Sequence, residues 1–254
     1  MAKDLGVLLD ADGSFKSHQL KAQKKTMERC SWILRTFYSR EPALLKTLWQ
    51  SLAQPYQDYA SQLWFPVGNT GDIAWQEKPL RMLTRRMKGL RGLNYWERLS
   101  QMKMLSSERR SERYKLLYLW KTLNGMAPSL GIEVNTVAGS RLGLTLKVPR
   151  RSGSKELVQT MKDRFFTGFA PRLFNCLPVQ VRECDTFPSF KAGVDLFLME
   201  VPDKPVLAGY FTPNWAKNGW QSNSIIDWTR NYTEIVTNFN LPVTGVENTQ
   251  EEWS

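Results

Sequence analysis

The stretch from Lys78 to Lys121, KPLRMLTRRMKGLRGLNYWERLSQMKMLSSERRSERYKLLYLWK, combines the two patterns that decide the fold. Apolar residues recur at steps of three and four, first at Leu80, Leu83 and Met87, as they do on the buried face of a helix. Between them lie 13 Lys and Arg residues and only three Glu residues, a net charge of +10 in 44 positions. The stretch therefore predicts packed helices with a strongly basic surface.

Helix-ending and helix-starting residues divide this stretch into three helices. Gly89 stops the first of them, and Asn94 is a typical N-cap for a short helix over residues 95–104. Ser106 opens a longer helix that reaches Lys121.

The residues before Lys78 predict further helices after a short strand. Weak alternation predicts a strand over residues 5–9, and a turn follows around Gly13. A helix from Gln19 would bury one face: Met27, Cys30, Leu34 and Phe37. A second helix, kinked or split by Pro55, would bury another: Leu45, Leu48, Leu52, Tyr56, Tyr59 and Leu63.

The residues after Lys121 have a different texture. Residues 142–148 alternate like a strand, residues 150–154 form a basic turn, and residues 188–199 predict a helix. Beyond Asp203 the chain is acidic and irregular. We therefore expect a mainly α fold in three parts. These are a short strand with a helical bundle (1–130), a smaller α+β region (131–202) and an irregular acidic tail (203–254).

The positive charge of the chain favours nucleic acid as its partner. Residues 1–202 carry 32 Lys and Arg residues against 18 Asp and Glu residues. Such a density is typical of proteins that bind a phosphate backbone. A basic helix on a membrane surface is the alternative, but it needs one clean apolar face opposite the charges. Here the charges span several elements, which favours nucleic acid and no membrane contact.

Several classes of chemistry lack their usual residues. His18 is the only histidine, and the three cysteines (Cys30, Cys176 and Cys184) include no CxxC pair, so neither a catalytic triad nor a zinc site is expected. Asp10 and Asp12 resemble the start of a calcium loop, but the later ligand positions do not fit, so we interpret them as a turn. We expect no cofactor and no small-molecule substrate.

Gly89-Leu-Arg-Gly92 admits two interpretations. A GxxG loop with a basic residue clamps a nucleic-acid backbone in KH domains, and it also serves as a plain turn between helices. The flanking segments predict helices, which favours the turn. An odd cysteine count and no apolar stretch near Met1 predict an intracellular protein, nuclear or cytoplasmic, that is not secreted.

Five stretches, in order over roughly residues 3–197, resemble the region after the catalytic palm in non-LTR retrotransposon (LINE-type, jockey-like) reverse transcriptases. The sequence departs from the family at Pro79, at Leu80 where the family has Gln, and at Phe174 where it has Trp. The stretches are Lys3 to Val7, Leu48 to Pro66, Asp72 to Arg85, Gly89 to Tyr114, and Phe169 to Lys191.

The resemblance implies an RNA-directed DNA polymerase fragment without its palm. The family's catalytic aspartates and their Mg²⁺ would belong to a palm preceding Met1, so no catalytic residue, metal ligand or independent activity is expected here. The implied partner is RNA or an RNA–DNA template–primer. Leu5, Gly6 and Val7 correspond to the primer-grip strand. The basic residues expected to bind nucleic acid are Lys78, Arg81, Arg85, Arg86, Lys88, Arg91, Arg98, Arg109, Arg110 and Arg113.

Two other functions stay open at this point. A domesticated copy of the fold would bind a protein partner through exposed aromatic residues. A decayed retroelement fragment would have no activity. An enzyme acting alone is the least supported alternative, because the sequence offers no residues to carry it.

Overall fold

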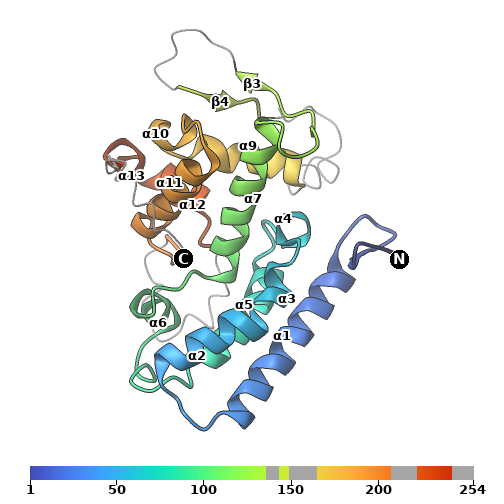
Figure 1. Cartoon of the computed structure of the whole chain (residues 1–254), viewed down its shortest axis with the longest axis vertical. Helices are drawn as coiled ribbons and strands as arrows, with labels where there is room; N and C mark the ends of the chain where they lie inside the picture. Colours follow the sequence, from blue (N-terminus) through green and yellow to red (C-terminus); the bar gives the residue numbers. More distant parts are fainter. Residues whose placement is uncertain (136–142, 149–164, 207–221, 242–254) are drawn as a thin grey trace, which may run out of the picture.

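One long helix, α7 (Ser107–Leu123), connects two hydrophobic cores (Figure 1). The computed structural model describes residues 1–135, 143–148, 165–206 and 222–241. In these residues the chain is mainly α-helical, with two small two-stranded antiparallel sheets, which confirms the predicted fold class. We call residues 2–104, built around the first core, the first lobe, and residues 105–241 the second lobe.

The first lobe consists of an N-terminal β-hairpin followed by a bundle of helices. Its core takes side chains from Val7 to Met104. In chain order its elements are β1 (Ala2–Asp4), β2 (Val7–Leu9), α1 (Lys16–Thr36), α2 (Pro42–Leu48), η1 (Trp49–Ala53), α3 (Pro55–Asp58), α4 (Ser61–Trp64), α5 (Thr70–Thr84) and α6 (Tyr95–Gln101).

The N-terminal hairpin corrects the predicted strand. Instead of running through residues 5–9, the chain turns at Leu5 and Gly6, which have φ values of 43° and 88°. β1 and β2 pair on either side of this turn, with Asp4 opposite Val7. Gly6 adopts the left-handed conformation without strain, which explains the turn at this point. The second turn, at Gly13, is as predicted: its N–H donates to the Asp10 carbonyl at 3.0 Å.

Pro55 splits the second predicted helix, as expected. Because proline lacks an N–H and clashes with the carbonyl four residues earlier, the backbone widens into the π-helical turn η1 directly before it. The wider turn shifts the buried face away from the predicted residues, and Leu52, Tyr59 and Leu63 are exposed. The core instead receives side chains at nearly four-residue steps: Leu45, Trp49, Ala53, Gln57, Ser61 and Trp64.

Side-chain caps set the start of the last three helices before Gly125. Asn69 accepts a hydrogen bond from the N–H of Asp72 at the start of α5, and Asn94 forms a capping box with Glu97 at the start of α6. Ser106 caps α7 by accepting from the N–H of Arg109. The starts predicted at Asn94 and Ser106 are therefore confirmed.

The second lobe packs short helices against the C-terminal half of α7 (Figure 1). Its aromatic core stacks Phe190 between Trp120 and Phe174, with ring centroids 5.7 and 6.2 Å away. Its elements are β3 (Val134–Asn135), β4 (Thr145–Leu146), α9 (Phe166–Asn175), α10 (Val179–Arg182), α11 (Phe187–Glu200), α12 (Ile225–Asn231) and α13 (Glu234–Thr237).

Part of the expected irregular tail belongs to this core. Residues 222–241 contain α12 and α13, and they bury Ile225, Trp228 and Phe239. The sequence prediction was wrong here because the tail's apolar residues are spread among polar ones, and their common face forms only by packing on the second core. The predicted turn at 150–154 and Trp215, Trp220 and Trp253 lie outside the described residues.

We predict that Trp228→Ala lowers the free energy of unfolding by about 3–5 kcal/mol, because it empties a well-filled core position. Trp228 is 7% exposed and donates its indole N–H to the Lys204 carbonyl at 2.6 Å. Met199→Ala, at an exposed position of the same lobe, is the control and should change it by less than about 0.5 kcal/mol. Chemical denaturation measures both, and equal effects of the two substitutions would contradict this placement.

Candidate functional site

Half of the ten predicted basic residues are exposed, on α5 and on the connection that follows it. Lys78, Arg85, Arg86, Lys88 and Arg91 are all exposed. They follow the outer face of α5 and the connection from α5 to α6. We call residues 85–91 with Lys78 the basic end.

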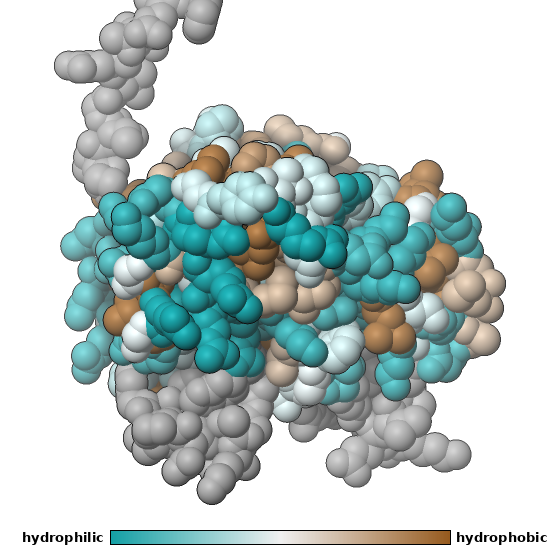
Figure 2. Space-filling model, turned by 90° about the horizontal axis from the view of Figure 1, so that it is seen from below, coloured by the Kyte–Doolittle hydropathy of each residue, from teal (hydrophilic) through white to brown (hydrophobic). Residues whose placement is uncertain are grey.

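The basic end is fixed to the turn between α1 and α2. The backbone N–H of Lys88 donates to the Arg40 carbonyl at 2.8 Å, and the Lys88 ammonium lies 3.1 Å from Glu41 Oε1. The α1–α2 turn lies at the bottom of Figure 1, and Figure 2 views the molecule from below. That face is covered mostly by hydrophilic side chains, with scattered hydrophobic ones between them (Figure 2).

Most cations of the basic end have no carboxylate partner. Lys88 pairs with Glu41, and Lys78 lies over the Trp75 ring, 4.9 Å from its centroid. Within the described part of the chain, Arg85, Arg86 and Arg91 form no ion pair. Their positive charges therefore face solvent.

The other five predicted binding residues point inward, which corrects the expectation of a second basic face. Arg81 is half-buried and its guanidinium lies 5.7 Å from the centre of the Tyr95 ring. Arg98 is buried and donates to Thr84 Oγ1 at 3.2 Å and to the Leu93 carbonyl at 2.6 Å. These contacts connect α5 to α6 and leave the Arg98 side chain no route to an external phosphate.

Arg109, Arg110 and Arg113 form ionic contacts inside the protein. Arg110 Nε donates to Asp58 Oδ1 at 3.1 Å, which joins α7 to the end of α3. Arg113 donates to both carboxylate oxygens of Asp195 on α11. Arg109 has no exposed side-chain surface, and its Nη2 donates to the carbonyls of Pro202 and Asn223. The sequence could not separate these residues from the basic end, because which face of α7 is covered depends on distant segments.

Buried carboxylates on α7 hold the 222–225 segment. Glu108 accepts hydrogen bonds from Ser222 Oγ and from the N–H of Asn223 at 2.7 and 3.1 Å. Glu112 accepts from the hydroxyl of Ser224 and, at 3.1 Å, from the N–H of Ile225. Each carboxylate therefore takes one side-chain and one backbone donor from the same short segment.

Burial dominates the ionisation of this cluster. It raises the pKa of Glu108 to about 8, and the neighbouring Glu112 carboxylate adds to this shift. It lowers the pKa of Lys115, one turn further along α7, to about 8. It also raises the pKa of Glu77, which accepts from the hydroxyl of Tyr95 and the N–H of Glu108.

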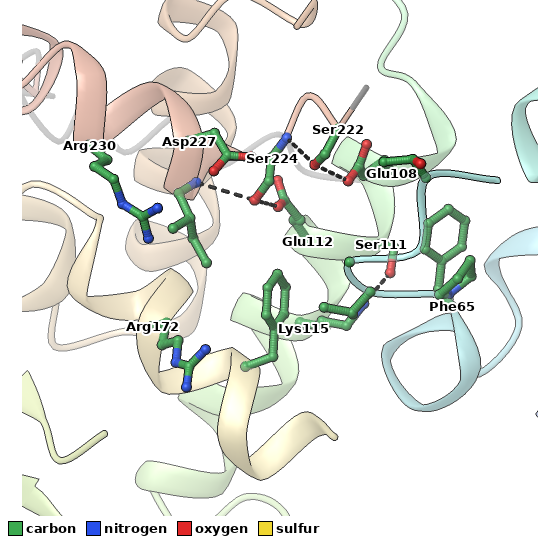
Figure 3. Close-up of a pocket in the computed structure, with 16 residues that line it drawn as sticks. Phe65, Glu108, Ser111, Glu112, Lys115, Arg172, Ser222, Ser224, Asp227 and Arg230 are labelled. Atoms are coloured by element: carbon green, nitrogen blue, oxygen red, sulfur yellow. Dashed lines mark hydrogen bonds between the residues drawn. The ribbon is translucent and has the colours of Figure 1, made fainter. Parts of the chain in front are cut away.

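A cleft of about 350 Å³ opens beside this cluster (Figure 3). The buried Lys115 lies between the rings of Phe65 and Phe169, and its ammonium donates to Ser111 Oγ. In Figure 3 the Lys115 side chain points toward Ser111, whereas Arg172 and Arg230 lie on the other side of the cleft. The cations lining the cleft therefore do not converge on one point.

Helix α1 adds cations that the sequence analysis did not single out. It carries six Lys and Arg residues against Glu28. Lys21, Lys25 and Arg29 recur at four-residue steps and so share one face of the helix. The four-residue spacing of these cations is visible in the sequence, but the charge density of α1 is lower than that of the stretch after Lys78.

The primer-grip-like residues fall in a turn. Leu5 is 84% exposed, and its carbonyl accepts from the Tyr59 hydroxyl at 2.6 Å. Gly6 lies against the Tyr59 ring, and Val7 enters the first core. These residues therefore lie apart from the basic end, at the other end of α1 (Figure 1).

Two of the sequence alternatives are settled by local geometry. Gly89 to Gly92 connects α5 to α6 without flanking strands, which confirms the helix-to-helix turn. Asp10 and Asp12 accept hydrogen bonds from residues 14–17, as expected of a turn. No helix in the described part of the chain is long and apolar enough to cross a bilayer.

In comparisons with known proteins, no family model, curated protein or solved structure matches the chain.

We predict that wild-type protein loses stability relative to Glu108→Gln as the pH rises from about 4.5 to 8. The folded pKa of Glu108 is raised to about 8, so the folded state holds a proton that the unfolded state releases above its usual pKa of 4.5. The stabilising contribution is thus complete below pH 4.5 and lost by pH 8, on the order of a few kcal/mol. Urea denaturation across this range measures the difference, and parallel pH curves would contradict the assignment.

Arginines of the same basic stretch should differ sharply in their effect on stability. Arg110→Met strands the largely buried Asp58 carboxylate, so we expect a loss of about 3–5 kcal/mol. Arg86→Met removes an exposed side chain without an ion pair and should change the free energy of unfolding by less than about 0.5 kcal/mol. A small effect of Arg110→Met in thermal or chemical denaturation would contradict the buried ion pair between Arg110 and Asp58.

Proposed function

We propose that the first lobe binds the phosphate backbone of RNA or of an RNA–DNA hybrid, without reading base sequence, as a thumb-like module of a reverse transcriptase. The observation that carries the proposal is the basic end: cations on a fixed connection, facing solvent, with Arg85, Arg86 and Arg91 free of ion pairs among the described residues. The resemblance of residues 3–197 to the post-palm region of LINE-type enzymes supports the same conclusion.

Physical chemistry favours phosphate as the ligand for such a surface. Exposed like charges repel one another, and a polyanion relieves this repulsion while releasing its condensed counterions. Contacts to phosphate oxygens position a protein on nucleic acid but carry no sequence information. An A-like hybrid has a wide, shallow minor groove and is recognised through shape and backbone, which suits a rigid basic helix end.

The buried arginines support the proposal in another way, because they stabilise the helices that carry the basic end. Arg98 joins α6 to Thr84 of α5, Arg110 joins α7 to Asp58 of α3, and Arg109 joins α7 to the Asn223 carbonyl. The basic end therefore projects from a framework that is itself cross-linked by charged hydrogen bonds. A fixed framework reduces the entropy lost when the exposed side chains engage a ligand.

We predict that Arg85→Gln, Arg86→Gln and Arg91→Gln together weaken binding to a 20-base-pair RNA–DNA hybrid. If each cation contacts one phosphate, the slope of log K against log salt concentration should become shallower by about 3. Fluorescence anisotropy between about 50 and 200 mM salt measures this slope. All hybrid sequences should be affected alike.

The matched control removes three exposed charges from the second lobe. Lys147→Gln, Lys191→Gln and Arg230→Gln change the net charge equally but leave the basic end intact. This variant should keep most of the wild-type slope. Equal losses in both variants would mean that only net charge matters, and salt-insensitive or undetectable binding of wild type would overturn the proposal.

A further inference from the structure

We propose that the first lobe prefers single-stranded nucleic acid, whose bases stack on exposed aromatic side chains beside the basic end. This inference deepens the proposed function and rests on it, because the same cations would hold the phosphates. The observation behind it is a row of cations on α1 that adjoins aromatic rings of α1, of α3 and of the α1–α2 turn. We call the residues Lys21, Lys25, Arg29, Trp32, Tyr38 and Tyr56 the basic–aromatic strip.

Helical spacing places the first part of the strip on one face of α1. Lys21, Lys25, Arg29 and Trp32 follow one another at steps of four, four and three, which lie on the same side of a helix. At a rise of about 1.5 Å per residue, they extend over about 16 Å. Trp32 is 40% exposed at the end of this row.

A tyrosine from α3 lies directly beside the two central cations. The Lys25 ammonium and the Arg29 guanidinium are 5.7 and 5.8 Å from the centroid of the Tyr56 ring. Such contacts preserve the positive charge and hold both side chains against the protein surface. Neither cation has an ion pair among the described residues.

The strip meets the basic end at the α1–α2 turn. Trp32 packs edge to face on Phe37, with centroids 6.1 Å apart, and the next residue, Tyr38, is 91% exposed. Two residues later, the Arg40 carbonyl accepts the backbone N–H of Lys88. The most exposed aromatic ring of the strip therefore stands next to the anchor point of the basic end.

An exposed tyrosine in this position suits an unpaired base. Burying a flat ring against a base removes apolar surface from water, and every base offers such a face, so stacking is insensitive to sequence. In a duplex the base faces are already stacked on one another and are closed to the protein. Cations that interleave with aromatic rings are therefore typical of surfaces that follow single strands.

The backbone of the turn holds this arrangement in place. Arg40 donates from its guanidinium to the carbonyls of Leu34, Phe37 and Ser39, which closes the C-terminal end of α1. The Tyr38 ring is thus carried on a chain segment with satisfied carbonyls on both sides. The backbone of this segment therefore has little conformational freedom left to lose when a base stacks on the ring.

The test compares a single strand that has bases with one that lacks them. The probes are a mixed-sequence, non-self-complementary RNA 12-mer, an abasic strand of equal length and charge, and a duplex. Wild type should bind the base-bearing strand most tightly. Tyr38→Leu should weaken that binding about tenfold and change binding to the abasic strand and the duplex by less than about twofold, because only stacking is removed.

The aromatic variant Tyr38→Phe is the matched control and should keep wild-type affinity for the base-bearing strand, because it retains the ring. If Tyr38→Leu leaves the preference for bases unchanged, or weakens all three probes equally, the stacking inference is wrong. The arginine triple variant separates this from the proposed function: it should weaken all three probes. If wild type binds none of them, the proposed function itself fails, whatever Tyr38 does.

Discussion

The buried carboxyl groups around the start of α7, Glu77 of the first lobe with Glu108 and Glu112 of the second, are the constraint on which the arrangement of the two lobes depends. Glu108 and Glu112 each accept two donors from the 222–225 segment. On the opposite side, the N–H of Glu108 donates to Glu77 of the first lobe. A buried carboxylate without such donors would cost several kcal/mol, so both lobes must keep their positions relative to α7.

This constraint explains why one continuous basic stretch contains both buried and exposed cations. Most charged side chains at the start of α7 are buried and form ion pairs or hydrogen bonds within the protein, as Arg110 does with Asp58. Beyond the end of α5, Arg85 and Arg86 are exposed among the residues that the structure describes. Charge that stabilises the fold and charge that is open to a polyanion are thus neighbours in sequence but separate in space. The proposed nucleic-acid binding follows from the second group alone.

The α1–α2 turn connects the two surfaces on which the proposals depend. It anchors the basic end through Lys88 and displays Tyr38 beside it. The cleft next to Lys115 has a different character, because Lys115, Glu108 and Glu112 form hydrogen bonds within the protein. Its cations lie on two sides of the cleft (Figure 3). The two proposals therefore concern the exposed cations and rings of the first lobe and make no use of this cleft.

Local sequence signals determined the caps at Asn94 and Ser106, the break at Pro55 and the turns at Gly13 and Gly89, because each rests on the backbone geometry of a few adjacent residues. Helical periodicity likewise determined the mainly α class. Tertiary structure decided which charges are buried, since Arg110 and Arg113 pair with Asp58 and Asp195, which lie 52 and 82 positions away. Arg109 pairs with the nearby Glu112 but is buried by donating to the distant carbonyls of Pro202 and Asn223. Tertiary structure also decided that residues 222–241 join the second core and that the α1 strip adjoins the basic end. Both depend on contacts between distant segments, which no local pattern encodes.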